Sequence, residues 1–77
     1  GQIYQIDASY TAKNGARITR IRWPDNAVDV IKVEGCSRGS GDLTRYDKSE
    51  RKKYETLPWS LKGTYLIDRV AREVCKL

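Results

Sequence analysis

The sequence of this 77-residue chain contains no histidine, no methionine and no phenylalanine, and it has only two prolines and two cysteines. Without histidine, the chain lacks the usual general acid–base group at neutral pH and the base of a Ser-His or Cys-His nucleophile pair. Its acidic residues form no recognisable catalytic pair, and no glycine pattern has the spacing of a phosphate-binding loop. We therefore expect a protein that is not an enzyme and that uses no cofactor.

The same scarcity argues against a metal site, because a zinc centre needs about four cysteine or histidine ligands. Cys36 and Cys75 are instead predicted to form a structural disulfide. The alternative is two buried free thiols, which pack as small apolar residues. A disulfide is typical of oxidising compartments, so we expect a secreted, extracellular or periplasmic protein. A start at Gly1, with no methionine and no signal peptide, is expected of a processed mature chain.

Length and composition predict a single domain over residues 1–77. Hydrophobic residues make up 39% of the chain and the mean hydropathy is −0.68, which allows one modest core. No apolar run approaches the roughly 20 residues that span a bilayer. The net charge is +5 and the isoelectric point about 9.4, so anionic partners are favoured, although this charge also suits simple solubility.

The N-terminal half has the pattern of an antiparallel meander. Apolar and polar residues alternate over about residues 3–10, and Asn14-Gly15 is a strong hairpin signal. A second strand is expected over about residues 16–23, with Ile18 out of phase and explained by a bulge or by a partly covered second face. Pro24 begins a turn, and the β-branched segment at about residues 27–34 predicts a third strand. Residues 37–42 are then expected to form a flexible loop.

The C-terminal segment has helical periodicity. Its apolar residues, which are Leu66, Ile67, Val70, Ala71, Val74 and Leu77, predict an amphipathic helix at about residues 65–76. Thr64 is the expected N-cap, and Asp68 near the first turn suits the helix dipole. The alternative is a strand over Thr64–Val70, because several of its side chains also suit a sheet.

The segment between these parts is ambiguous. Leu43, Tyr46, Glu50, Tyr54 and Leu57 fall at helical spacing, which predicts a short charged helix near residues 47–56; an ordered charged loop is the alternative. The predicted fold is thus α+β, with a three-stranded antiparallel meander packed by a C-terminal helix and a short charged helix or loop between them.

Cations and aromatic residues are interleaved in two places. The candidate binding residues are Arg20, Arg22, Arg45, Tyr46, Arg51, Lys52, Lys53 and Tyr54. Phosphate contacts use arginine and lysine, and base stacking uses aromatic rings, so such a surface suits RNA or single-stranded nucleic acid. The alternative is a charged helix face whose tyrosines pack on the core.

The order Tyr54-Glu55, Pro58, Gly63, Tyr65 and Asp68-Arg69-Val70 resembles a stretch of the fungal guanyl-specific ribonucleases. It is also similar to the catalytically inactive ribonuclease-like effectors that some plant-pathogenic fungi secrete. The resemblance covers about residues 54–70. It implies that Glu55 stands at the catalytic carboxylate position and that Thr64–Val70 is a strand. The catalytic histidines of that family have no counterpart here, so the resemblance implies no catalysis.

Three functions follow from these observations. The first is a small secreted, disulfide-stabilised basic protein of the effector, toxin or inhibitor type, which binds a protein or polyanionic target. The second is a nucleic-acid-binding module that uses the basic and aromatic residues named above. The third is a subunit completed by another chain, with Leu57, Trp59 and Leu61 as the contact; these residues also suit a core.

Overall fold

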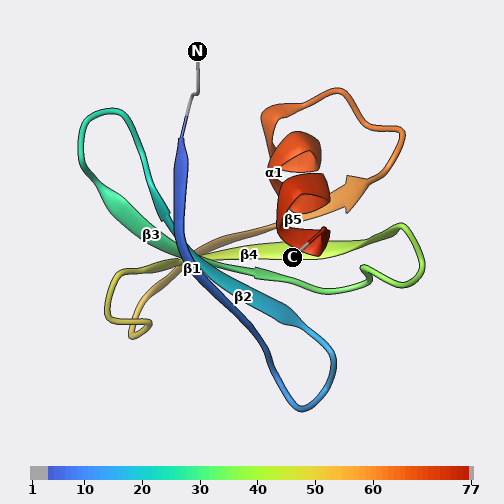
Figure 1. The fold of residues 1–77 in the computed structure, drawn as a ribbon, viewed down its shortest axis with the longest axis horizontal. Coiled ribbons are helices and arrows are strands. Elements are labelled where there is room, and N and C mark those ends of the chain that lie inside the picture. Colours follow the sequence, from blue (N-terminus) through green and yellow to red (C-terminus); the bar gives the residue numbers. More distant parts are fainter. Residues whose placement is uncertain (1–3, 77) are drawn as a thin grey trace.

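The computed structural model describes residues 4–76, which form an antiparallel sheet of five strands followed by one helix (Figure 1). The elements are β1 (Gln5–Thr11), β2 (Arg17–Arg22), β3 (Val28–Val33), β4 (Ser40–Asp47), β5 (Lys53–Ser60) and α1 (Leu66–Cys75). Each strand pairs with the next one along the chain, so the sheet order is β1-β2-β3-β4-β5. In Figure 1 the strands cross near the middle of the view and spread outward, as expected of a twisted sheet.

The prediction of a three-stranded meander is wrong, because the sheet has two further strands. The ambiguous segment forms most of β4 and β5, and there is neither a helix near residues 47–56 nor a charged loop of that length. Residues 40–42, expected in a flexible loop, are the first residues of β4. The register pairs Leu43 with Leu57 and Arg45 with Glu55. These contacts join residues ten or more positions apart, and local periodicity does not reveal such pairings.

The three N-terminal strands lie close to their expected positions, although residue 3 of the first lies outside the described residues. The irregularity of the hairpin is in β1, where the register shifts between Ile6 and Ala8. Ile6 packs against the core, whereas Tyr10 is 55% exposed, so the two do not share a buried face as the alternation suggested. Ile18 lies on the face of the sheet opposite the core and is half-buried beside Tyr10 of β1.

The core lies between α1 and one face of the sheet, which we call the covered face. Its buried residues are Ile21, Ile31, Val33, Leu43, Trp59, Val70, Ala71 and Val74. Side chains alternate along a strand, so the chain neighbours of these sheet residues project from the opposite side, which we call the open face.

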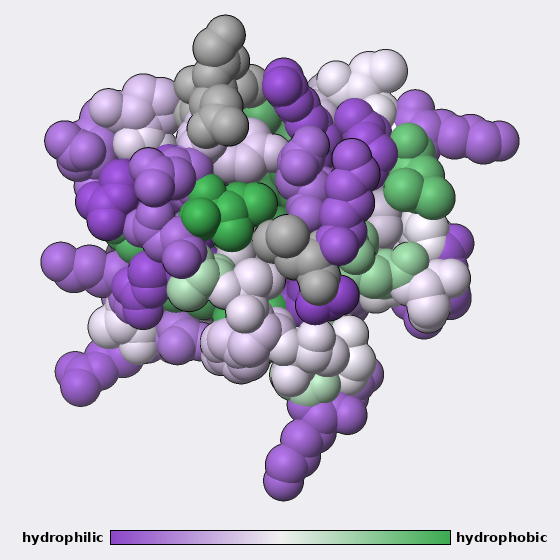
Figure 2. Space-filling model, viewed as in Figure 1, coloured by the Kyte–Doolittle hydropathy of each residue, from purple (hydrophilic) through white to green (hydrophobic). Residues whose placement is uncertain are grey.

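The surface in Figure 2 is mostly hydrophilic, with long side chains projecting at its rim, in keeping with a charged fraction of 32%.

The helix begins after Tyr65, not after the expected N-cap Thr64. Asp68 is only 4% exposed, and its carboxylate accepts hydrogen bonds from the backbone N–H of Tyr65 (3.0 Å) and of Ser60 (2.9 Å). These bonds satisfy one N–H at the start of the helix and tie it to the end of β5. A side chain at Gly63 would overlap the Asp68 carboxylate, so glycine is required there. The alternative of a strand over Thr64–Val70, which the ribonuclease resemblance also implied, is wrong.

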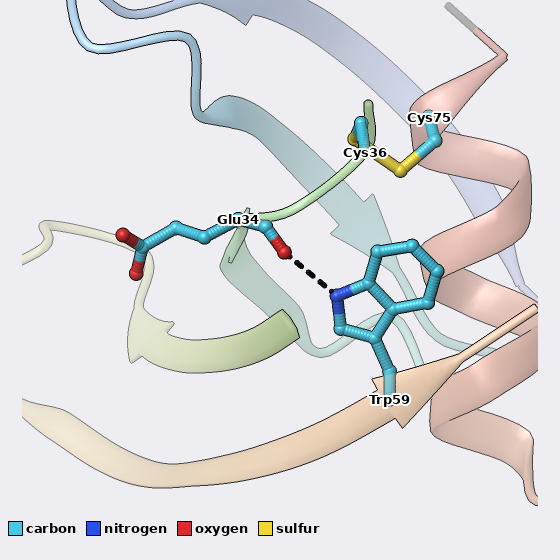
Figure 3. Close-up of a disulfide and its surroundings, with 4 residues drawn as sticks. All are labelled: Glu34, Cys36, Trp59 and Cys75. Carbon is cyan, nitrogen blue, oxygen red and sulfur yellow. Dashed lines mark hydrogen bonds between the residues drawn. A yellow bond between two sulfur atoms is a disulfide. The ribbon is translucent and has the colours of Figure 1, made fainter. Parts of the chain in front are cut away.

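The predicted disulfide between Cys36 and Cys75 is confirmed, with the two Cα atoms 5.4 Å apart and no free cysteine among residues 4–76. It joins the loop after β3 to the last residue of α1. Figure 3 shows the indole of Trp59 next to the bridge and the helix, with its Nε1 donating a hydrogen bond to the Glu34 carbonyl oxygen (2.9 Å). Trp59 is 3% exposed and therefore belongs to the core, which leaves it unavailable as an outer contact with another chain.

Candidate functional site

The open face collects four of the predicted binding residues. Arg20 and Arg22 flank the buried Ile21 and therefore project from the open face. The register then places Arg20, Val30, Tyr46 and Lys53 in one row across β2, β3, β4 and β5. No helix covers this side of the sheet in the described structure, since α1 packs against the covered face.

Two residues that sequence reasoning missed, Lys32 and Tyr10, also lie here. The ammonium of Lys32 is 5.9 Å from the centre of the Tyr46 ring, which is a cation–π distance. The exposed Tyr10 stands opposite Ile18 on β1. The guanidinium of Arg20 reaches the backbone oxygen of Lys48, 3.5 Å away, at the turn after β4. Alternation along β3 would have placed Lys32 on this face.

Acidic groups balance only part of this charge. Arg22 pairs with Asp7 (3.0 Å) and Lys32 with Glu34 (3.8 Å), and both pairs are solvent-exposed and contribute little to stability. Neither Arg20 nor Lys53 has a carboxylate partner among residues 4–76. The open face therefore has an unbalanced positive row that includes an aromatic ring.

Two further predicted cations, Arg51 and Lys52, sit at the β4–β5 turn, where Asp47 organises the backbone. Its carboxylate accepts hydrogen bonds from the N–H of Arg51 (2.9 Å) and the hydroxyl of Ser49 (3.1 Å), while Glu50 has a positive φ of 63°. The side chains of Arg51 and Lys52 are consequently exposed on an ordered turn. Lys52 lies 5.7 Å from the centre of the Tyr54 ring, on the other side of the sheet from Lys53.

The pKa of Asp47 is held below its usual value of 3.8: desolvation acts to raise it, but the hydrogen bonds from the backbone of Lys52 and Arg51 and from Ser49 together outweigh that effect. A depressed folded-state pKa stabilises the folded protein above about pH 3.8, and this stabilisation is lost as the pH falls through the folded-state pKa. We expect the side-chain carboxyl carbon of Asp47, followed by NMR, to titrate at lower pH in the folded protein than in urea. Equal midpoints in the two states would contradict this prediction.

Arg45 and Tyr54 do not join the open face. Arg45 lies on the covered face, where its guanidinium contacts Glu55 (2.8 Å) and Asp29 (3.2 Å). The centre of the Tyr54 ring lies 4.7 Å from the guanidinium carbon of Arg45. Trp23 Nε1 donates a hydrogen bond to the Asp29 carboxylate (2.8 Å). Burial acts to lower the pKa of Arg45, but hydrogen bonds to Glu55 and Asp29 raise it further above its usual value, so this cation stays charged.

These side chains line a groove of about 650 Å³ on the covered face, together with residues of the first turns of α1. The β2–β3 turn contributes Trp23, Pro24, Asp25 and Ala27 to the lining. The apolar walls are Ile31, Leu43, Leu57, Leu66, Ile67 and Val70. The groove could not be predicted from the sequence, because β3, β4, β5 and α1 each contribute only a few of its lining residues.

No protein-family model matches this chain, and neither the curated proteins nor the solved structures include a match to it. The ribonuclease resemblance therefore stays a prediction. In the structure Glu55 is paired with Arg45 beside an apolar groove. Within residues 4–76, no helix has the length and hydropathy to cross a membrane, and no three cysteine, aspartate or glutamate side chains are grouped to hold a metal ion.

Proposed function

We propose that this chain is a disulfide-stabilised binding protein of the effector, toxin or inhibitor type, and that it acts by contact through the open face of its sheet. The observation that carries the proposal is the row of Arg20, Tyr46 and Lys53, flanked by Arg22 and Lys32. These cations project from rigid strands, so their spacing is set by the sheet. A surface of this charge suits an anionic partner. The disulfide is compatible with an extracellular location.

Among anionic partners, single-stranded nucleic acid fits the open face best. Tyr10 is exposed and Tyr46 half-exposed, so both offer ring surface for stacking beside the cations. A duplex presents its bases edge-on and is less suited to such a surface. The turn cations Arg51 and Lys52 extend the positive potential beyond the sheet.

The test is fluorescence anisotropy with a labelled single-stranded RNA of about ten nucleotides, within the range of known single-strand site sizes. We expect binding at low salt, with the logarithm of affinity falling by roughly 0.7 per phosphate contact for each tenfold rise in salt. The variant R20Q/K53Q should bind at least tenfold more weakly than the unmodified protein, because it removes both cations of the row, neither of which has a carboxylate partner among residues 4–76.

The matched control is K13Q/K62Q, which makes the same change in net charge at exposed positions outside the strands. It should reduce affinity much less than R20Q/K53Q. Equal weakening by both variants would show binding through net charge alone and would reject the open face as the site. Binding to heparin but not to RNA would replace nucleic acid with another polyanion, and no binding to either at low salt would reject an anionic partner.

A further inference from the structure

The groove on the covered face has the opposite electrostatic character to the open face. Its lining includes the carboxylates of Asp25, Asp29 and Glu55 but only one cation, Arg45. Lys52 stands near its rim through contact with the Tyr54 ring. The lining is therefore acidic in a protein whose net charge is +5. This contrast separates the groove from the surface proposed to bind polyanions.

The most buried carboxylate of the lining, that of Asp29, retains unused acceptor capacity. Asp29 is 8% exposed, and its hydrogen bonds from Trp23 and Arg45 both end on Oδ2. No hydrogen bond to Oδ1 occurs among residues 4–76, yet Oδ1 is not a fully buried unsatisfied atom. It therefore retains access to solvent, and Asp29 lines the groove. Glu55 is similar, because both of its contacts with Arg45 use Oε2.

The rest of the lining is apolar and aromatic. Leu66 on the first turn of α1 is 46% exposed at the groove, and Ile67 and Leu57 are half-buried there. Covering these side chains removes apolar surface from water, which is favourable at about 25 cal/mol per Å². The volume of about 650 Å³ lies within the range of roughly 300–1,000 Å³ of small-molecule sites.

We propose that this groove binds a small ligand that combines an apolar body with a protonated amine. The apolar body lies against Leu57, Leu66 and Ile67, and the ammonium group donates hydrogen bonds to Oδ1 of Asp29 and Oε1 of Glu55. Arg45 already satisfies the other oxygen of each carboxylate and holds both in place. A ligand carboxylate would meet these acceptor oxygens and be repelled, which gives the site a preference by charge.

The two tryptophans provide a built-in readout. In a ¹⁵N NMR spectrum each indole N–H gives its own signal; that of Trp23 is bonded to Asp29 in the groove, and that of Trp59 is bonded to Glu34 beside the disulfide. The probes are hexylamine, hexanol and hexanoate, which share a chain and differ in charge. We expect the amine to shift the Trp23 signal and leave Trp59 unchanged, with affinity at least fivefold above that of the alcohol and with hexanoate weakest.

Two charge variants isolate the ammonium contact. D29N keeps the shape of the side chain and removes its charge, so amine affinity should fall toward that of hexanol, with Glu55 retaining part of the preference, while hexanol binding is unchanged. E55Q should also lower amine affinity, by a smaller factor. It provides the test of the ammonium contact if D29N does not fold. D42N, at an exposed position on β4 outside the groove, makes the same charge change and should leave amine binding unaltered.

Several outcomes would overturn the proposal. Equal affinity for amine and alcohol would remove the charge preference, and tighter binding of hexanoate would reverse it. No shift of the Trp23 signal with millimolar amine would reject the site. Self-association at rising protein concentration, with shifts confined to groove residues, would identify a second copy of the chain as the occupant. None of these results depends on whether the open face binds RNA.

Discussion

Removing the disulfide is expected to lower the free energy of unfolding by about 3–4 kcal/mol, the value of the chain-entropy model for a loop of this length. The bridge joins residues separated by 39 positions and connects the last residue of α1 to the loop after β3. The helix has only 10 residues, a length that is marginal for an isolated helix in water. Without the bridge, α1 depends on its packing and on the Asp68 contacts at its other end.

The variant C36A/C75A, compared with the oxidised protein by urea denaturation, measures this loss directly. The melting temperature should fall by about 12–32 °C, given about 4–8 °C per kcal/mol for a domain of this size. Added reductant should destabilise the unmodified protein and leave the variant unchanged. Equal stability of the variant and the oxidised protein would show that the bridge contributes nothing to the fold.

Replacing Trp59 by alanine should cost about 3–5 kcal/mol, the usual range for a large aromatic residue in a core. Its indole lies between β5 and α1, next to the disulfide (Figure 3), and is buried on the covered face. W59F should cost less, because it keeps a ring in the core. It still removes the donor to the Glu34 carbonyl, an effect of about 1–3 kcal/mol for a buried group.

Urea denaturation of both variants tests this order. Y10A serves as the aromatic control, since Tyr10 is on a strand but 55% exposed, and it should cost about 1 kcal/mol or less. A loss for W59A no larger than that for Y10A would contradict the central position of Trp59 in the core. Trp59 contacts the region of the bridge, so W59A and C36A/C75A are expected to be non-additive when combined.

The error in the fold prediction came from a segment whose local pattern fits two structures. Leu43, Tyr54 and Leu57 are spaced for a helix, yet Leu43 pairs with Leu57 across two strands. The positive φ of Glu50 and the carboxylate of Asp47 make the tight turn that joins these strands, and neither residue marks a hairpin as clearly as Asn14-Gly15 does. The pairing energy of the sheet outweighed the helical periodicity.

The predicted binding residues are divided between the two faces of the sheet, because this segment forms strands and not a helix. The charged helix predicted near residues 47–56 would have kept Lys53 and Tyr54 on adjacent parts of one surface. In strands, Arg45 and Tyr46 point to opposite faces, and the irregularity opposite them sends Lys53 to the open face while Tyr54 lines the groove. Residues that are neighbours in the sequence therefore take part in two surfaces of opposite charge.

The sequence by itself determined the disulfide, the C-terminal helix and the approximate positions of the first three strands. The disulfide follows from composition, because the two cysteines have no other metal ligands to join. The helix and the strands follow from local signals, which are the 3.6-residue period of α1 and the alternation beside a strong turn. Only the tertiary structure decided the number of strands, the row of Arg20, Tyr46 and Lys53, and the groove around Arg45. These features depend on the register between strands, which is set by contacts between residues far apart in the chain.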